Sequence, residues 1–311
     1  MDQDIITVNG CKTRIIQAGS GPSDIVLIHA GAFSTGPVCH NALAWELNMP
    51  GLARSYRVSA FDLLGQGRTD QPSDGSDYTY DAVAAHAQAT IDALGIRRAH
   101  IVAHDHGAIT AVSLAFAQPE LVASCTIVGS PTLTPSGDNI PNRLLDGPLE
   151  PRSSREGQRW AMDRQSFTTD HLDRGRFLDE AASIGASDGF RRAQAHFTNR
   201  QPQDISFERS LDKIKIQFFA RIRDTGFPTP LLFLNGNQDP TFSTPNAAIL
   251  SAGMDLWSPA AYARQMFTLV APKQEFCQFK LVNQAGYWFF REKPEKFNQV
   301  ISGYIEGVEG V

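Results

Sequence analysis

Short runs of apolar residues recur along this 311-residue chain, and longer amphipathic segments separate them. Residues 24–30 (DIVLIHA) contain an unbroken Ile/Val/Leu run, which is typical of a strand covered on both faces of a sheet. Residues 79–95 carry apolar side chains along one side and end in a glycine, a pattern that predicts a helix. The pattern repeats with strands at 99–104 and 124–131 and a helix at 106–120. This alternation predicts an α/β fold with a mostly parallel, doubly wound sheet.

The alternation is interrupted in the middle of the chain. Residues 132–228 have helical spacing and no convincing strand. They are interpreted as a helical lid, inserted between two parts of a sheet domain at 1–131 and 229–311. The second part predicts two strands and a closing helix, at 228–240, 276–286 and 293–307.

Composition excludes several classes of function. A net charge of −5 provides no basic surface for nucleic acid, and the longest apolar runs fall short of the roughly 20 residues that span a bilayer. The acidic start MDQDIITVNG has neither the basic nor the apolar region of a signal peptide. The four cysteines are widely spaced, which favours free thiols in a reducing compartment over disulfides or a metal site. We therefore expect a cytoplasmic protein that binds no nucleic acid, membrane or metal.

The segment 99–111 (AHIVAHDHGAITA) predicts a reactive residue on a sharp turn between a strand and a helix. Ala103 and Gly107 provide the small side chains that such a turn needs, and Asp105 lies midway between them. The turn would direct the backbone N–H of His106 at charge developing on a substrate, and the helix N-terminus favours an anionic Asp105. An aspartate that merely caps the helix is the alternative.

Four further motifs occur in order at predicted strand ends, and together with the turn they resemble the α/β-hydrolase superfamily over nearly the whole chain. The resemblance is to the branch of haloalkane dehalogenases, epoxide hydrolases and meta-cleavage-product hydrolases. It implies a nucleophile position at Asp105, an acid position at Asp239, and an oxyanion hole formed by N–H groups of His106 and of Ala30 or Gly31. The four motifs are HAGAF (29–33), DLLGQGRTD (62–70), GNQD (236–239) and NQAGYWFFREKPEKF (283–297).

The sequence departs from this family at one decisive position. The motif that carries the catalytic histidine in the family reads Gly286–Tyr287–Trp288 here, so Tyr287 replaces the histidine. Attack by a carboxylate forms an ester with the enzyme, and releasing that ester requires a base that activates water. A tyrosine with a pKa of about 10 is a poor base at neutral pH but a good hydrogen-bond donor. Asp105 is then free to act as the base.

Other histidines and several aromatic residues are also candidates for the site. His106 is equally consistent with a site role and with packing, whereas His104 should point to the opposite side of its strand and pack in the core. Either lid histidine, His171 or His196, is a further candidate for lining the pocket. Core packing is at least as consistent for the tryptophans as contact with a ligand. The expected substrate contacts are Phe33, His106, Trp160, Trp257 and Trp288.

Three functions remain open at this stage. The first is a cofactor-independent enzyme that acts on a small-to-medium, largely apolar carbonyl compound, with Asp105 as base or nucleophile and Tyr287 as donor, in lyase, isomerase or C–C bond chemistry. The second is a true hydrolase in which another histidine activates water. The third is a ligand-binding protein that has lost catalysis. In each case the partner is a small organic molecule, and the chain is expected to be a monomer or a homodimer.

Overall fold

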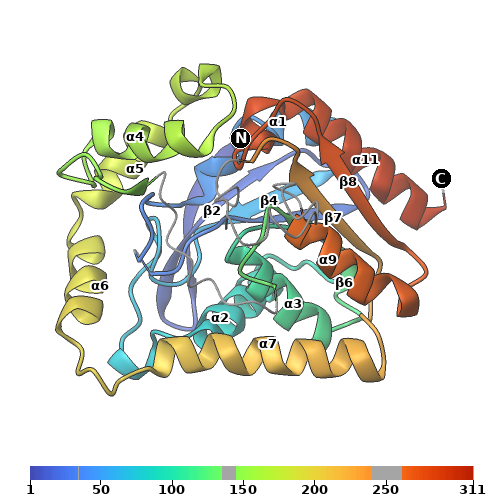
Figure 1. Cartoon of the computed structure of the whole chain (residues 1–311), viewed down its shortest axis with the longest axis horizontal. Coiled ribbons are helices and arrows are strands. Elements are labelled where there is room, and N and C mark those ends of the chain that lie inside the picture. Colours follow the sequence, from blue (N-terminus) through green and yellow to red (C-terminus); the bar gives the residue numbers. More distant parts are fainter. Residues whose placement is uncertain (34, 135–144, 240–260, 311) are drawn as a thin grey trace, which may run out of the picture.

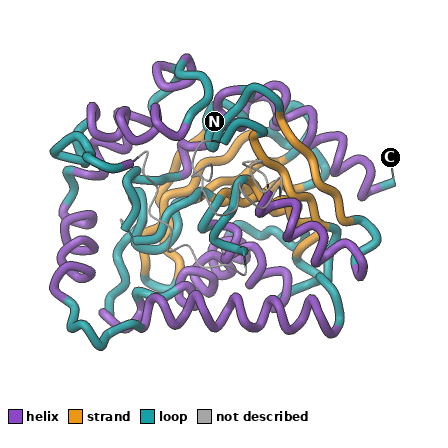
Figure 2. The backbone as a smooth tube through the Cα atoms, in the orientation of Figure 1, coloured by secondary structure: helices purple, strands orange, loops and turns teal. Residues whose placement is uncertain are grey.

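The computed structural model describes residues 1–33, 35–134, 145–239 and 261–310, and its backbone is drawn in Figures 1 and 2. A central sheet runs through the molecule, with helices on both of its faces (Figure 2). Within the described residues the strand order is β1-β2-β4-β3-β5-β6-β7-β8. The strands are β1 (Asp2–Val8), β2 (Cys11–Ala18), β3 (Asp24–Ile28), β4 (Arg57–Phe61), β5 (Ala99–His104), β6 (Val122–Val128), β7 (Leu231–Gly236) and β8 (Cys277–Val282).

From β4 across to β8 all neighbouring strands are parallel, whereas β2 pairs with β4 in the antiparallel sense. This confirms the predicted α/β class and the mostly parallel sheet. The hairpin β1–β2 was not predicted. Its turn is Asn9–Gly10, where both residues have positive φ (49° and 82°), as a tight two-residue hairpin requires.

The helices that follow the strands cover both faces of the sheet. They are α1 (Met49–Leu52), α2 (Tyr80–Ala93), α3 (Gly107–Ala117), α9 (Ala261–Val270), α10 (Phe289–Glu292) and α11 (Pro294–Glu309). Alternate residues of β3 belong to different apolar clusters: Val26 packs with α2 and α3, and Leu27 packs with α1 and α11. Burial on both faces explains why these strands have continuous apolar sequences.

The described part of 132–228 contains helices and short turns but no strand. Its helices are α4 (Arg155–Gln165), α5 (Phe177–Gly185), α6 (Asp188–Asn199) and α7 (Ser206–Asp224). The long helix α7 packs along α2 and α3 and crosses the lower edge of Figure 1. Part of the predicted lid therefore lies against the flanking helices. The exact division into lid and sheet domain stays a prediction.

Buried charges connect α5 to the sheet domain. Arg14 of β2 is 5% exposed, and its guanidinium binds the buried carboxylate of Asp62 with an Nε–Oδ2 distance of 2.7 Å. The same guanidinium binds Glu180 of α5, which also accepts a hydrogen bond of 2.9 Å from Nε of Arg68. Two arginines of the sheet domain thus hold one lid carboxylate.

The N-terminus of α5 is held by a carboxylate from the sheet domain. The buried side chain of Glu46 accepts hydrogen bonds from the backbone N–H groups of Arg176 (2.8 Å) and Phe177 (2.9 Å). Negative charge at the first turn also stabilises a helix through its dipole. Gly175 has a φ of +79°, and a Cβ there would lie 2.3 Å from the Glu46 carboxylate, so this position requires glycine.

Candidate active site

Asp105 occupies the sharp turn between β5 and α3. Its φ is +47°, a left-handed conformation that is uncommon for a residue with a side chain and that aspartate tolerates better than most. Ser130 fixes the turn by donating its hydroxyl to the Asp105 carbonyl at 2.8 Å. At Gly107 a Cβ would lie 2.6 Å from the carbonyl oxygen of His29, so the helix can start this close to β3 only with glycine. The local geometry is that of the predicted turn.

Both oxygens of the Asp105 carboxylate accept a hydrogen bond. The hydroxyl of Tyr287 donates to Oδ2 at 2.7 Å, and the hydroxyl of Thr132 donates to Oδ1 at 3.0 Å. Thr132 follows β6 and is 2% exposed, and Tyr287 is 3% exposed. The structure thus brings Asp105 and Tyr287 together, and it adds Thr132, which sequence reasoning missed.

The phenol of Tyr287 is held in its protonated form. Burial raises its pKa well above the ordinary value of 10, and the nearby charge of Asp105 and the hydrogen bond to it raise the pKa further. The more distant charge of Asp239 acts in the same direction. At neutral pH this side chain is a hydrogen-bond donor and not a base.

A second phenol lies near the same carboxylates. Tyr262 of α9 accepts a hydrogen bond from the side-chain amide of Asn235, which is at the end of β7 and is 1% exposed. Burial raises the pKa of Tyr262 well above 10, with further contributions from the charges of Asp239 and Asp105. Asp239 follows β7 and is fully buried. Asn235 is the one polar residue in the apolar run LLFLN, a signal that sequence reasoning did not use, whereas Tyr262 lies in no recognisable motif.

The loop after β3 is held rigidly beside this turn. The ring of His29 is fully buried, and its Nε2 accepts the backbone N–H of Leu63 at 3.0 Å. Burial is the largest of the effects that lower the His29 pKa, so the ring is neutral. Gly31 has a φ of +108°, and a Cβ there would lie 2.5 Å from Gln66 Oε1. Ala30 is completely buried. The roles of Ala30, Gly31 and His106 as oxyanion donors stay predictions.

Two histidines flank Asp105 and differ in their surroundings. His104 is fully buried against the rings of Tyr287 and Phe290, at 4.5 and 4.7 Å between centroids. Burial is the main cause that lowers its pKa to about 4. His106 is partly exposed, and its Nδ1 is hydrogen-bonded to the hydroxyl of Tyr80. Of the two, His106 has the better access to a bound molecule.

The lid histidines are occupied elsewhere. His171 is hydrogen-bonded through Nε2 to the Ser166 hydroxyl at 2.9 Å, and burial lowers its pKa to about 3. His196 stacks on Tyr78, with 4.1 Å between ring centroids. Neither contact involves Asp105 or Tyr287, and a pocket-lining role for either histidine stays a prediction.

The aromatic residues expected to contact substrate have separate positions. Phe33 is 1% exposed and packs edge-on against Tyr78 at 5.0 Å. Trp288 is fully buried and donates its indole N–H to Gln165 Oε1 at 3.3 Å, so its described contacts are packing contacts. Trp160 of α4 lies under the guanidinium of Arg164, 4.2 Å from the ring centroid. Trp257 lies outside the described residues.

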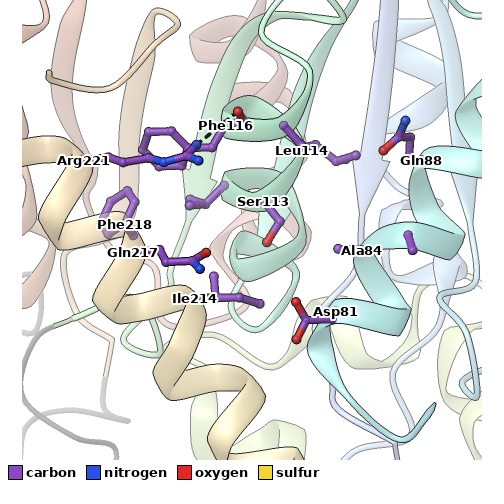
Figure 3. Close-up of a pocket in the computed structure, with 13 residues that line it drawn as sticks. Asp81, Ala84, Gln88, Ser113, Leu114, Phe116, Ile214, Gln217, Phe218 and Arg221 are labelled. Carbon is purple, nitrogen blue, oxygen red and sulfur yellow. Dashed lines mark hydrogen bonds between the residues drawn. The ribbon is translucent and has the colours of Figure 1, made fainter.

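Two cavities of similar size occur away from Asp105. One of about 280 Å³ lies between α2, α3 and α7, and Figure 3 shows Arg221 of α7 against the ring of Phe116 of α3, 4.8 Å from its centroid. Another of about 290 Å³ lies between α4, α6 and the loop that carries Cys39. The pocket predicted over Asp105 stays a prediction, because residues 240–260 lie outside the described part of the chain.

The described residues bear on metal binding, disulfides and membrane spans. No group of three or more His, Cys, Asp or Glu side chains there is arranged to hold a metal ion. The four cysteines, all of them in the described part, are free thiols. None of the described helices combines the length and the apolar character that crossing a membrane requires.

Comparison with known proteins gives relatives of two kinds. The chain is 35% identical over 125 residues to 2-hydroxymuconate semialdehyde hydrolase of Pseudomonas sp. (strain CF600), a match that covers 40% of this chain and 42% of the relative. It is 21% identical over 328 residues to bifunctional epoxide hydrolase 2 of Mus musculus, which covers 96% of this chain and 54% of the relative. The matches thus span about half the length of these relatives or less.

Solved structures share the fold at low sequence identity. The meta-cleavage product hydrolase of Pseudomonas fluorescens IP01 has a TM-score of 0.69 and 21% identity, with 98% of this chain and 97% of that chain covered. The epoxide hydrolase CorEH has a TM-score of 0.66 and 16% identity, with 99% of both chains covered. The sequence model described as "Alpha/beta hydrolase family" matches residues 25–300. That match covers most of the chain and contains Asp105, Asp239 and Tyr287, and the chain therefore belongs to the alpha/beta hydrolase family.

Proposed function

We propose that this protein is a cofactor-independent enzyme in which Asp105 acts as a general base on a largely apolar carbonyl compound. The single observation that carries the proposal is the 2.7 Å hydrogen bond from the Tyr287 hydroxyl to Asp105 Oδ2. A protonated phenol therefore lies where the family places an imidazole. Tyr287 is the donor of the pair, and Asp105 is the group that can accept a proton.

The Asp105 carboxylate is held in place and can still accept a proton. Each of its oxygens accepts one hydrogen bond, from Tyr287 and from Thr132. These bonds orient the carboxylate, and each oxygen keeps a second lone pair that can take a proton. In the proposed step Asp105 removes a proton from the carbon next to a substrate carbonyl. The resulting enolate is stabilised by the N–H of His106 and by one N–H near Ala30 or Gly31.

Hydrolysis through an enzyme ester is less well supported by the same geometry. Release of the ester needs a base beside the carboxylate, and burial together with the charge of Asp105 keeps the pKa of Tyr287 well above its ordinary value. Tyr287 would have to lose its proton to serve as that base. A site built in this way suits isomerisation, C–C bond cleavage or C–C bond formation at an acidic C–H.

Hydrolysis remains the second candidate because of one specific contact. His106 is partly exposed next to Asp105, and the hydroxyl of Tyr80 holds its Nδ1. This leaves Nε2 as the nitrogen that would activate water. The relatives named hydrolases agree with this reading at the level of the family.

Isotope labelling separates the candidates. The protein is incubated with a panel of aryl ketones and β-diketones in D₂O, and deuterium at the carbon next to the carbonyl is followed by NMR. A parallel single turnover in H₂¹⁸O is analysed by mass spectrometry of the peptide that contains Asp105. A general base exchanges the substrate proton and leaves Asp105 unlabelled, whereas hydrolysis of an ester introduces ¹⁸O into the carboxylate. Ligand binding with neither label would identify a protein that has lost catalysis.

A further inference from the structure

The loop that carries Tyr287 is bonded to the end of lid helix α4. The backbone N–H of Tyr287 donates to the carbonyl of Gln165 at 3.0 Å. The next side chain in the loop, Trp288, donates to the side-chain oxygen of the same glutamine at 3.3 Å. Gln165 is 7% exposed, so these bonds are shielded from water. The position of Tyr287 therefore depends on a residue of the lid.

The buried carboxylate of Glu292 forms a second connection between the Tyr287 loop and the lid. Oε1 of Glu292 accepts the backbone N–H of Gly286 at 2.9 Å. Its Oε2 accepts the backbone N–H of Thr168 at 2.8 Å and the Thr168 hydroxyl at 3.2 Å. The Glu292 side chain is 8% exposed, which makes charge-assisted bonds of this kind stronger than they are at a surface. Glu292 thus joins the residue before Tyr287 to the lid.

The backbone of the Tyr287 loop is in close contact, at Gly286, with the backbone at the end of α4. A Cβ at Gly286 would lie 2.7 Å from the backbone nitrogen of Phe167 and 2.8 Å from the carbonyl oxygen of Gln165. Only glycine permits this distance. Residues 165–168 and 286–288, together with the Glu292 carboxylate, form a contact that we call the lid clamp.

Arg291, the residue before Glu292, connects the short helix α10 to the rest of the sheet domain. Arg291 is 1% exposed and donates to the carbonyl oxygens of Leu43 (3.1 Å) and Ala44 (3.0 Å). Its guanidinium also binds Glu46 at 3.2 Å. Helix α10 is therefore held to the sheet domain by Arg291 and to the lid by Glu292 and by a further bond of 3.0 Å from Arg291 to the carbonyl of Arg174. The phenol of Tyr287, just before α10, is placed by both.

We propose that Glu292 is a positioning residue, which holds the loop of Tyr287 against lid residues 165–168 and thereby places the phenol on Asp105. A displacement of the end of α4 consequently weakens the Tyr287–Asp105 hydrogen bond. The effect on catalysis rests on the proposed function, but the effect on this hydrogen bond does not, and it can be measured without a substrate.

The measurement uses the ¹³C signals of the phenol carbons of the six tyrosines in protein labelled at tyrosine Cζ. Tyr287→Phe assigns the Tyr287 signal, and Asp105→Ala gives its position without the acceptor. Glu292→Gln is the test variant because it preserves the shape of the side chain. Its amide has one acceptor oxygen, so in either orientation an NH₂ group faces a backbone N–H and one side of the lid clamp is lost. Thr168→Val removes one further donor with little change in volume.

The matched control is Glu180→Gln, which weakens another lid carboxylate, partly exposed and held by Arg14 and Arg68. We expect Glu292→Gln to move the Tyr287 signal at least half of the way to its Asp105→Ala position, Thr168→Val to move it less, and Glu180→Gln to leave it in place. On a substrate that the enzyme turns over, Glu292→Gln should lower kcat by about tenfold or more with little change in KM.

Two results would overturn the proposal. In the first, Glu292→Gln raises the rate of amide hydrogen exchange at 165–168 and 286–288 while the Tyr287 signal keeps its wild-type position. In the second, Glu180→Gln moves the signal as far as Glu292→Gln does. If the signal moves as expected but no carbonyl compound is turned over, the lid clamp stands and the proposed function fails.

Discussion

The hydroxyl of Tyr287 donates a hydrogen bond of 2.7 Å to Asp105, a residue 182 positions earlier in the chain. Tyr287 is a hydrogen-bond donor to the Asp105 carboxylate, whereas the imidazole that the family usually has at this position would act as a base. In the function proposed above, the reaction follows from this replacement of a base by a hydrogen-bond donor. The predictions below test separate consequences of it.

Asp105→Asn should abolish turnover, with a loss of about 10²–10⁴-fold if the carboxylate acts as the base. The amide still accepts a hydrogen bond from Tyr287, so the fold and the ligand affinity should survive. The assay is deuterium exchange into the substrate, with a thermal-shift titration for binding. Thr132→Val, which removes only the bond to Oδ1, is the milder comparison. Full activity of Asp105→Asn would remove the carboxylate from the mechanism.

Tyr287→Phe should lower kcat by about 10²-fold, because the ring keeps its packing and only the donor to Asp105 is lost. The measurement is steady-state kcat and KM for wild type and variant on the same substrate. An unchanged kcat would mean that the phenol is only structural.

Tyr287→His restores the residue that the family usually has at this position. For a non-hydrolytic native reaction, we expect the variant to lose that reaction and to gain weak hydrolysis of esters or epoxides. The measurement is product analysis of native and hydrolytic substrates side by side. Faster turnover of the native substrate by the same reaction would show that Tyr287 is a degraded histidine position, and the preferred function would be wrong.

His104 should make the protein less stable in acid. Burial is the main cause that lowers its folded-state pKa to about 4, whereas the unfolded value is about 6.5, so the unfolded chain binds the extra proton first. The contribution of His104 to stability is thus present above pH 6.5 and is lost as the pH falls towards 4. Between pH 7 and pH 5 the loss is about 2 kcal/mol.

His104→Phe provides the check, because its ring fits the surrounding aromatic side chains and does not titrate. Urea unfolding at pH 7 and at pH 5 should give a smaller pH difference in the variant than in the wild type. The control is His196→Gln, a histidine that stacks on Tyr78 in the lid. Equal pH differences in wild type and His104→Phe would mean that His104 does not contribute to the acid sensitivity.

Much of the fold was predictable from the sequence because burial on both sides of the sheet makes strands such as β3 continuously apolar. The N-terminal hairpin was missed, since β1 is largely exposed and has an acidic sequence, although Asn9–Gly10 is a recognisable hairpin turn. The proximity of Asp105 and Tyr287 was predictable because both occupy family motifs, after β5 and after β8, at the same edge of the sheet.

Other parts of the candidate site were not predictable in this way. Thr132, Asn235 and Tyr262 are single polar residues whose roles arise only when loops from different strands meet. The same applies to the lid clamp, where Glu292 bonds to Thr168 across 124 residues. Sequence reasoning also could not place Trp288, since one aromatic residue in an aromatic-rich motif has no pattern that separates packing from ligand contact.

The carboxylates that connect lid and sheet domain have a consequence for recombination between relatives. Glu46 and Glu292 of the sheet domain bind backbone groups of the lid, and Glu180 of the lid binds arginines of the sheet domain. Exchanging the lid alone for that of a relative would take Glu180 away from Arg14 and two backbone N–H groups away from Glu46. Each would then keep only its partner in the sheet domain, Asp62 or Arg291. We therefore expect a chimera that carries both sides of each contact to be more stable than one that exchanges the lid alone.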